Sequence, residues 1–286
     1  MSAKPMHLTA VPIVHPTDFS ELSRGAFAHA LRIGLAAHCK LYVVHIADRQ
    51  DGDQDGNPWL AFPHVRETLA RWGLCEESEL PAAAFERLGV EVAKVEIEPQ
   101  DPVRGLARFL AGHPSGLMVL ATEGREGLPR WIRPSMAEAM SRRSATQTLF
   151  IPPHGQGFVD AQTGLISLKR ILVPVDHHPP AAAAIGAVRQ FCRALEVEAE
   201  IQVVHIGTVA PLLAPACGHA YRIEVDLKTG PGSVVDGILQ AATRGRADLI
   251  CMATAGHDGL LDAIRGSTTE RVLRQAPCPV LAVPAA

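Results

Sequence analysis

Short apolar runs alternate along the chain with alanine-rich segments in which apolar residues recur at helical spacing. The runs predict strands over residues 13–18, 41–46, 90–97, 117–121 and 148–151, and again over 171–176, 201–206, 223–227, 249–253 and 280–283. Helices are predicted over residues 20–37, 102–111 and 135–143, and again over 181–195, 234–243 and 267–275. Continuous apolar strands between helices are typical of a parallel sheet covered on both faces, with right-handed crossovers. The pattern therefore predicts an α/β fold in which each half contributes five parallel strands.

The two halves are copies of one another. Residues Leu120 to Pro152 align without a gap with Met252 to Pro284, and twelve of the aligned positions are identical. The second copy contains Gly256, nine residues, then Gly266 and Ser267; the first contains Gly124, nine residues, then Pro134 and Ser135. The chain is thus an internal duplication in which one copy of a glycine loop carries a proline.

Length and turn residues predict where the halves divide. A chain of 286 residues is about the length of two domains. Prolines and glycines gather at residues 152–164, so we expect one domain over residues 1–153, a linker over 154–168 and a second domain over 169–286. The second domain has only about 14 residues (207–220) between its second and third strands, against about 43 in the first, which predicts a truncated crossover.

Composition excludes several classes of protein. The chain is 47% hydrophobic and 20% charged with a formal charge of −3, which gives no global attraction to nucleic acid or to an anionic membrane. No apolar stretch approaches a membrane span or a signal sequence. Six scattered cysteines show no zinc-site spacing and are expected to be reduced and mostly buried. We therefore expect a soluble, cytoplasmic protein without a resident metal.

The candidate site lies where strands are followed by loops. In parallel sheets a ligand binds beyond the carboxyl ends of the strands, near the switch in strand order. Asp176 follows the first strand of the second half, and the Gly256 to Gly266 loop follows the fourth. Small residues before a helix let a phosphate approach unpaired backbone N–H groups closely. In the first half, Pro134 removes one N–H group and fixes φ near −65°, so we expect no triphosphate to bind there.

These features together resemble the universal stress protein family. The resemblance is carried by the aspartate after the first strand, by Val-Val-His-Ile in both halves (residues 43–46 and 203–206), by the glycine loop and by the ending Arg274-Gln-Ala-Pro-Cys-Pro-Val-Leu281. It implies two tandem Rossmann-like domains of the stress-protein type and, for one branch of the family, binding of ATP or AMP. The family's loop begins with a glycine where this chain has Ala253, a departure that keeps a small residue.

The resemblance also implies roles for particular residues of the second half. Pro174, Val175, Asp176 and Ile206 would hold adenine, and Met252 and Ala253 would flank the base or ribose. The residues that would hold phosphates are Gly256, Gly266, Ser267 and Thr268. Mg²⁺ would enter only with ATP. The two domains would pair through their last strands as an intramolecular pseudo-dimer, and a homodimer is a further option.

Structural alternatives stay open for several of these residues. Asp18 and Asp176 also suit helix N-caps, and Ser267 with Glu270 suits a capping box. His45 and His205 are expected to be structural, and His177 with His178 lacks the further ligands that a metal needs.

No catalytic motif is present in the sequence, which contains no Walker A lysine, GxSxG or HExxH. The sequence therefore predicts a nucleotide-binding stress-response protein that catalyses slow ATP hydrolysis at most. An interaction module that binds no nucleotide is the alternative, and an adenylating enzyme is a third, less favoured one.

Overall fold

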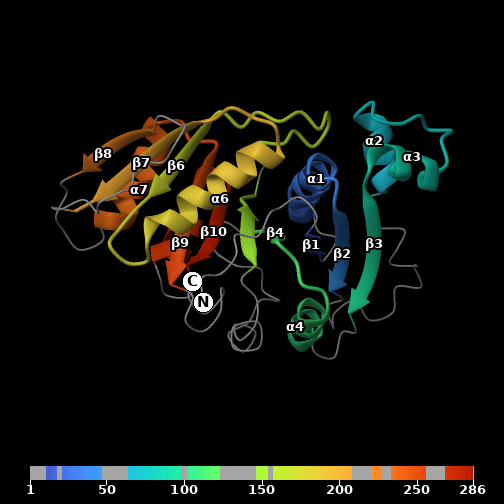
Figure 1. Cartoon of the computed structure of the whole chain (residues 1–286), viewed down its shortest axis with the longest axis horizontal. Helices are drawn as coiled ribbons and strands as arrows, with labels where there is room; N and C mark the ends of the chain where they lie inside the picture. Colours follow the sequence, from blue (N-terminus) through green and yellow to red (C-terminus); the bar gives the residue numbers. More distant parts are fainter. Residues whose placement is uncertain are drawn as a thin grey trace.

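The protein is described here from a computed structural model of the chain (Figure 1). The structure describes residues 11–17, 21–46, 64–97, 102–122, 146–153, 157–207, 221–226, 233–255 and 268–285.

The described elements repeat in the two halves. Those of the first half are β1 (Ile13–Thr17), α1 (Glu21–Ala36), β2 (Lys40–Ile46), α2 (Val65–Arg71), α3 (Pro81–Leu88), β3 (Glu91–Ile97), α4 (Pro102–Gly112), β4 (Leu117–Ala121) and β5 (Gln147–Ile151). Those of the second are β6 (Arg170–Pro174), α6 (Ala181–Ala194), β7 (Glu200–Ile206), β8 (Tyr221–Asp226), α7 (Ser233–Arg244), β9 (Leu249–Ala255), α9 (Thr268–Leu273) and β10 (Val280–Ala285).

The described strands form one ten-stranded sheet in the order β3-β2-β1-β4-β5-β10-β9-β6-β7-β8. Within each half all neighbouring strands are parallel. The halves meet where β5 and β10 pair antiparallel, with Leu281 opposite Leu149. The predicted pairing through the last strands is thus present within the chain, and β3 and β8 lie at opposite ends of the sheet (Figure 1).

Helices cover both faces of this sheet, as predicted. Adjacent residues of β1 point to opposite faces: Ile13 belongs to a buried cluster that also contains residues of α1, α2 and α6, and Val14 belongs to a second cluster that contains residues of α4, α7 and α9. All five residues of β1 are buried, as expected of a central strand that is covered on both faces. The fold is therefore two tandem Rossmann-like domains that share one continuous sheet.

The crossover from β2 to β3 contains two helices that the sequence pattern did not predict. They have only seven and eight residues, too few to show a clear helical period. Local signals were nevertheless present for α3, since Pro81 occupies its first turn and Gly89 ends it with a left-handed φ of 65°. In the second half, β8 still pairs parallel with β7 from Ile201 opposite Tyr221 onward, so the return is completed within the short predicted crossover. Residues 208–220 themselves lie outside the described residues.

The described part of the predicted linker packs into the core. Phe158 is only 1% exposed, and its ring meets His29 of α1 edge-on at 4.6 Å and Phe191 of α6 at 5.9 Å. A β-bridge joins Val159 to Ile166, and we call residues 157–168 the junction hairpin. This hairpin therefore joins the helices of both halves rather than only connecting the chain.

Helix α2 also holds the junction hairpin. The Trp72 indole N–H donates to the carbonyl oxygen of Ala161 at 3.2 Å. Gly164, at a φ of +69°, lies against the same indole, so that a Cβ added there would be 2.5 Å from the Trp72 ring. The glycine is required both by its backbone conformation and by this close approach.

We expect Gly164→Ala to destabilise the protein more than Gly73→Ala, its matched control. Gly73 has a similar φ of +70° but nothing within 4 Å of an added Cβ, so its substitution reports the left-handed conformation alone. That cost is about 1 kcal/mol, whereas Gly164→Ala adds an overpacking cost of about 1–3 kcal/mol. Urea unfolding of the two variants measures the difference, and equal midpoints would contradict the close packing of the junction hairpin on Trp72.

Candidate functional site

The carboxyl edge of the second half brings together β6, β7 and β9 at the switch in strand order. From β6 the sheet continues to β7 and β8 on one side and to β9 and β10 on the other. Pairing between β6 and β9 ends at Leu172 opposite Ile250, whereas β9 stays paired with β10 up to Ala255. This is the position at which α/β sheets of this type bind ligands.

Val175 follows β6 at this edge, and its backbone polar groups are already engaged. Its N–H donates to the carbonyl oxygen of Val204 at 2.9 Å. Its carbonyl oxygen lies 3.0 Å from Nδ1 of His205, which must donate because the carbonyl can only accept. The carbonyl keeps a second lone pair, but the N–H of Val175 is not available to a base in this arrangement. Of the two backbone polar groups of Val175, only the carbonyl oxygen can therefore still bind a base, as a hydrogen-bond acceptor.

His205 has a larger part at this site than the sequence indicated. It is buried at the end of β7, as expected of a structural histidine, and its hydrogen bond fixes the loop that begins at Val175. Its ring also meets that of His177 edge-on, with centroids 6.0 Å apart. The recurrence of Val-Val-His-Ile in both halves was the sequence signal for this role.

Asp176 is exposed in the loop that leads to α6. Its Oδ1 accepts the backbone N–H of His177 at 2.8 Å, and a β-bridge to Pro180 closes the loop. The carboxylate therefore lies at the carboxyl edge, where a ligand can reach it.

The strand β9 presents its predicted site residues on alternate faces. Met252 is buried on the face covered by α7, and Ala253 is half-buried on the face covered by α6. The next residue, Thr254, is buried and donates its hydroxyl to the carbonyl oxygen of Val283 at 3.4 Å. Thr122 makes the corresponding bond to Ile151 in the first half at the same distance. The threonine before each glycine loop therefore anchors the end of its strand.

The remaining predicted site residues divide between described and undescribed parts of the chain. Pro174 ends β6, Ile206 ends β7 beside α7, and Thr268 is the half-buried first residue of α9. The phosphate residues Gly256, Gly266 and Ser267 lie outside the described residues, as do the first-half residues Asp18, Gly124, Pro134 and Ser135. Their roles stay predictions.

The five cysteines that the structure describes are free thiols. Burial raises the pKa of Cys39 and of Cys192 to about 11 and that of Cys278 to about 12, and it also raises the pKa of Cys251. Among the described residues no three histidine, cysteine or acidic side chains gather as metal ligands, so His177 and His178 gain no third partner there. None of the described helices is both long and apolar enough to cross a membrane.

The fold and the position of the site define a tandem α/β protein of the Rossmann-like class. A sequence profile described as "Universal stress protein family" matches residues 11–152 and 216–284, which is more than half of the chain. The chain belongs to the universal stress protein family. The part between these matches includes β6, α6 and β7, which repeat β1, α1 and β2 of the first half.

Two named relatives agree with this assignment. A universal stress protein of Methanocaldococcus jannaschii is 27% identical over an alignment of 140 residues, with 40% of this chain and 81% of that protein covered. A universal stress protein of Thermus aquaticus is 44% identical over 52 residues, 18% of this chain and 38% of that protein.

Solved structures share the tandem fold over nearly the full length. A universal stress protein of Archaeoglobus fulgidus has a TM-score of 0.59 at 17% identity and covers 98% of both chains. A Pseudomonas aeruginosa protein of unknown function has a TM-score of 0.57 at 14% identity, with 97% of this chain and 94% of the other covered. At these identities the similarity concerns the fold alone.

Proposed function

We propose that this chain is a stress-response protein that binds ATP or AMP through its second half, with little or no catalysis. One observation carries the proposal: the loop after β6, the end of β7 and the strand β9 meet at the sheet's switch point, where the sequence also places the Gly256 to Gly266 loop. Asp176 supplies an exposed carboxylate there as a hydrogen-bond acceptor for a base or ribose. The predicted first-half loop contains Pro134 instead, which supports a single site.

Calorimetric titration of ATP, ADP and AMP tests the phosphate loop through Gly266→Pro. We expect this substitution to weaken ATP binding at least about tenfold, which is about 1.4 kcal/mol. The physical reason is that proline removes a backbone N–H donor and places its ring where a phosphate would lie. The first half provides the matched control, because Pro134→Gly should leave the affinity of the second half unchanged. Unchanged binding in Gly266→Pro would exclude the proposed phosphate site.

A second candidate function is an interaction module that binds no nucleotide. The engagement of both Val175 backbone groups favours it, because a base then loses one of the predicted backbone donors. Small molecules released from the purified protein, identified by mass spectrometry, separate the two: adenine nucleotide supports the first function. Absence of nucleotide from the release, together with no heat of binding, supports the second.

Turnover of radiolabelled ATP on the same samples tests the catalytic part of the proposal. A turnover rate constant above about one per second, an ordinary enzymatic value, would contradict the proposal that the protein binds nucleotide with little or no catalysis.

A further inference from the structure

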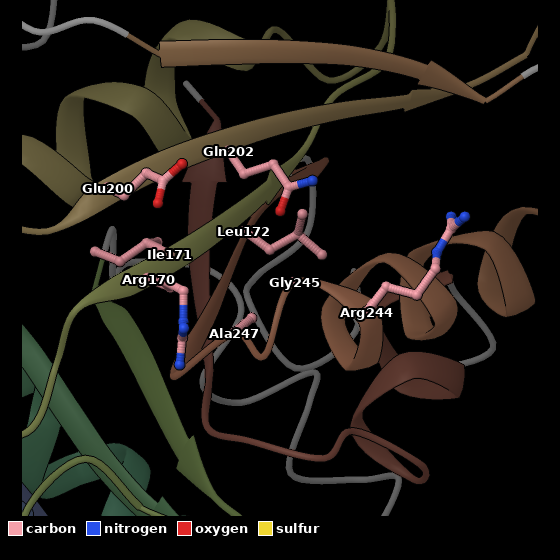
Figure 2. A pocket seen from close by; sticks show the side chains of 8 residues that line it. All are labelled: Arg170, Ile171, Leu172, Glu200, Gln202, Arg244, Gly245 and Ala247. Carbon is pink, nitrogen blue, oxygen red and sulfur yellow. The ribbon is translucent and has the colours of Figure 1, made fainter.

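A hollow opens at the amino edge of the second half, at the end of the strands opposite to the proposed nucleotide site (Figure 2). Its volume is about 360 Å³. Arg170 and Leu172 of β6, Glu200 and Gln202 of β7, and Arg244 and Gly245 at the end of α7 line it. The volume falls within the range of small-molecule pockets, about 300–1,000 Å³.

The duplication places an equivalent position in the first half. Gln202 lies opposite Leu172 in the β6·β7 ladder, as Tyr42 lies opposite Val14 in the β1·β2 ladder. At the helix ends, the N–H of Gly245 donates to the carbonyl of Ala241 at 2.8 Å, and the N–H of His113 donates to that of Phe109 at 2.9 Å. Gln202, Ala241 and Gly245 therefore correspond to Tyr42, Phe109 and His113.

In the first half aromatic rings occupy this position. The rings of Phe109 and His113 stack with centroids 4.2 Å apart. The ring of Tyr42 meets both edge-on, at 5.2 Å and 5.1 Å, and Lys40 lies over the Tyr42 ring at 5.0 Å. Side chains thus cover the sheet there.

In the second half all three aromatic residues are replaced by smaller or more flexible ones. Gly245 lies close to the sheet, so that a Cβ added there would be 2.6 Å from Oε1 of Gln202. A histidine at this position, as in the first half, would have to displace Gln202. Fewer side-chain atoms therefore cover the sheet at this position in the second half than in the first.

The polar lining is positively charged overall and also contains acceptors. Two guanidinium groups, from Arg170 and Arg244, line the hollow from opposite sides, together with the single carboxylate of Glu200 and the amide of Gln202 (Figure 2). Arg170 is held in place because its Nε donates to the carbonyl of Arg246 at 2.9 Å. Arginine pairs with carboxylate and phosphate groups, and the Glu200 carboxylate accepts hydrogen bonds from hydroxyl groups.

We propose that this hollow binds a small organic anion, a carboxylate or a phosphate ester that also carries a hydroxyl group. The anionic oxygens face Arg244, the hydroxyl group faces Glu200 or Gln202, and Leu172 contacts the carbon skeleton, while Arg170 adds positive charge on the other side of the hollow. The site is separate from the proposed nucleotide site and does not depend on it.

Titration of the ¹⁵N-labelled protein with L-malate, and separately with glycerol 3-phosphate, tests the site. We expect saturable shifts of the Gly245 and Ala247 amide signals with a Kd in the millimolar range or tighter for at least one probe. The two arms distinguish a carboxylate from a phosphate ligand. No shift of these signals with either probe would overturn the proposal.

Two variants test the mechanism of binding. The triple variant Gln202→Tyr, Ala241→Phe and Gly245→His copies the first half and should weaken binding at least about tenfold by filling the hollow. Arg244→Gln leaves the hollow unfilled but removes one charge, and it should weaken binding several-fold, whereas Arg193→Gln on the opposite face should not. Undiminished binding in the folded triple variant or in Arg244→Gln would refute the proposal, and Arg244→Gln decides alone if the triple variant does not fold.

Discussion

Replacement of Phe158 by alanine is expected to lower the free energy of unfolding by about 3–5 kcal/mol. The ring is fully buried between His29 of α1 and Phe191 of α6, so its removal leaves a cavity lined by both halves of the chain. Edge-to-face contacts with two rings add to the loss of buried apolar area.

The junction hairpin itself supplies the matched control. Leu165 lies in the same hairpin but is 70% exposed, so Leu165→Ala should change stability by less than about 0.5 kcal/mol. Urea unfolding followed by circular dichroism measures both variants. If Phe158→Ala were as stable as Leu165→Ala, residues 157–168 would be a linker in the ordinary sense, with no part in the core.

The second large effect concerns pH: the protein is expected to lose about 3 kcal/mol of stability through His29 alone between pH 6.5 and pH 4. His29 is completely buried, and this burial lowers its pKa from 6.5 to about 4, although a hydrogen bond to Gly25 opposes the shift. Nε2 of His29 accepts the N–H of Val159 at 3.1 Å, so Nδ1 carries the proton and donates to the carbonyl of Gly25 at 2.7 Å. A second proton on Nε2 would face the N–H of Val159 and break that bond.

Stability falls with decreasing pH because the unfolded chain binds this proton at a higher pH than the folded protein does. Above pH 6.5 the histidine is neutral in both states and no penalty arises. Between pH 6.5 and about 4 the unfolded chain is protonated and the folded protein is not, so stability falls with pH by about 1.4 kcal/mol per unit. Below about pH 4 both states are protonated and this contribution becomes constant.

Comparison with His29→Gln isolates the effect. Glutamine has an amide that can accept from Val159 and donate to Gly25 but does not titrate. From pH 6.5 to pH 4 the free energy of unfolding of His29→Gln should therefore fall by about 3 kcal/mol less than that of the unchanged protein. The carboxylates contribute equally to the pH dependence of both proteins. Parallel curves of unfolding free energy against pH would contradict the assigned state of His29.

The central strands could be predicted from the sequence because they are buried on both faces. Val43 and Val44 of β2 point to opposite faces of the sheet and both are buried, so the strand appears as an unbroken apolar run. The helices α2 and α3 could not be predicted in the same way. Their positions depend on packing, as when the Trp72 indole N–H reaches Ala161, and a sequence pattern carries no record of such distant contacts.

The candidate site was predictable in its position more than in its detail. The duplicated motifs indicated which edge of the sheet matters, because the carboxyl ends of parallel strands lie together. The hydrogen bond from His205 to the Val175 carbonyl was not predictable, since it depends on the rotamer and tautomer of His205. The hollow beside Gly245 could not be predicted either, because the equivalent residues of β2 and β7 are identified only from the register of the two ladders.

The antiparallel pairing of β5 with β10 has an evolutionary consequence. In a symmetric dimer one gene encodes both subunits, so each substitution appears on both sides of the contact. Here the two sides are encoded separately, and each can change without altering the other. The first half has Pro134 where the second has Gly266, and Tyr42 where the second has Gln202. A symmetric dimer would have had to carry each of these differences in both subunits or not at all. In a tandem chain the two halves can therefore diverge in sequence while both continue to form the shared sheet.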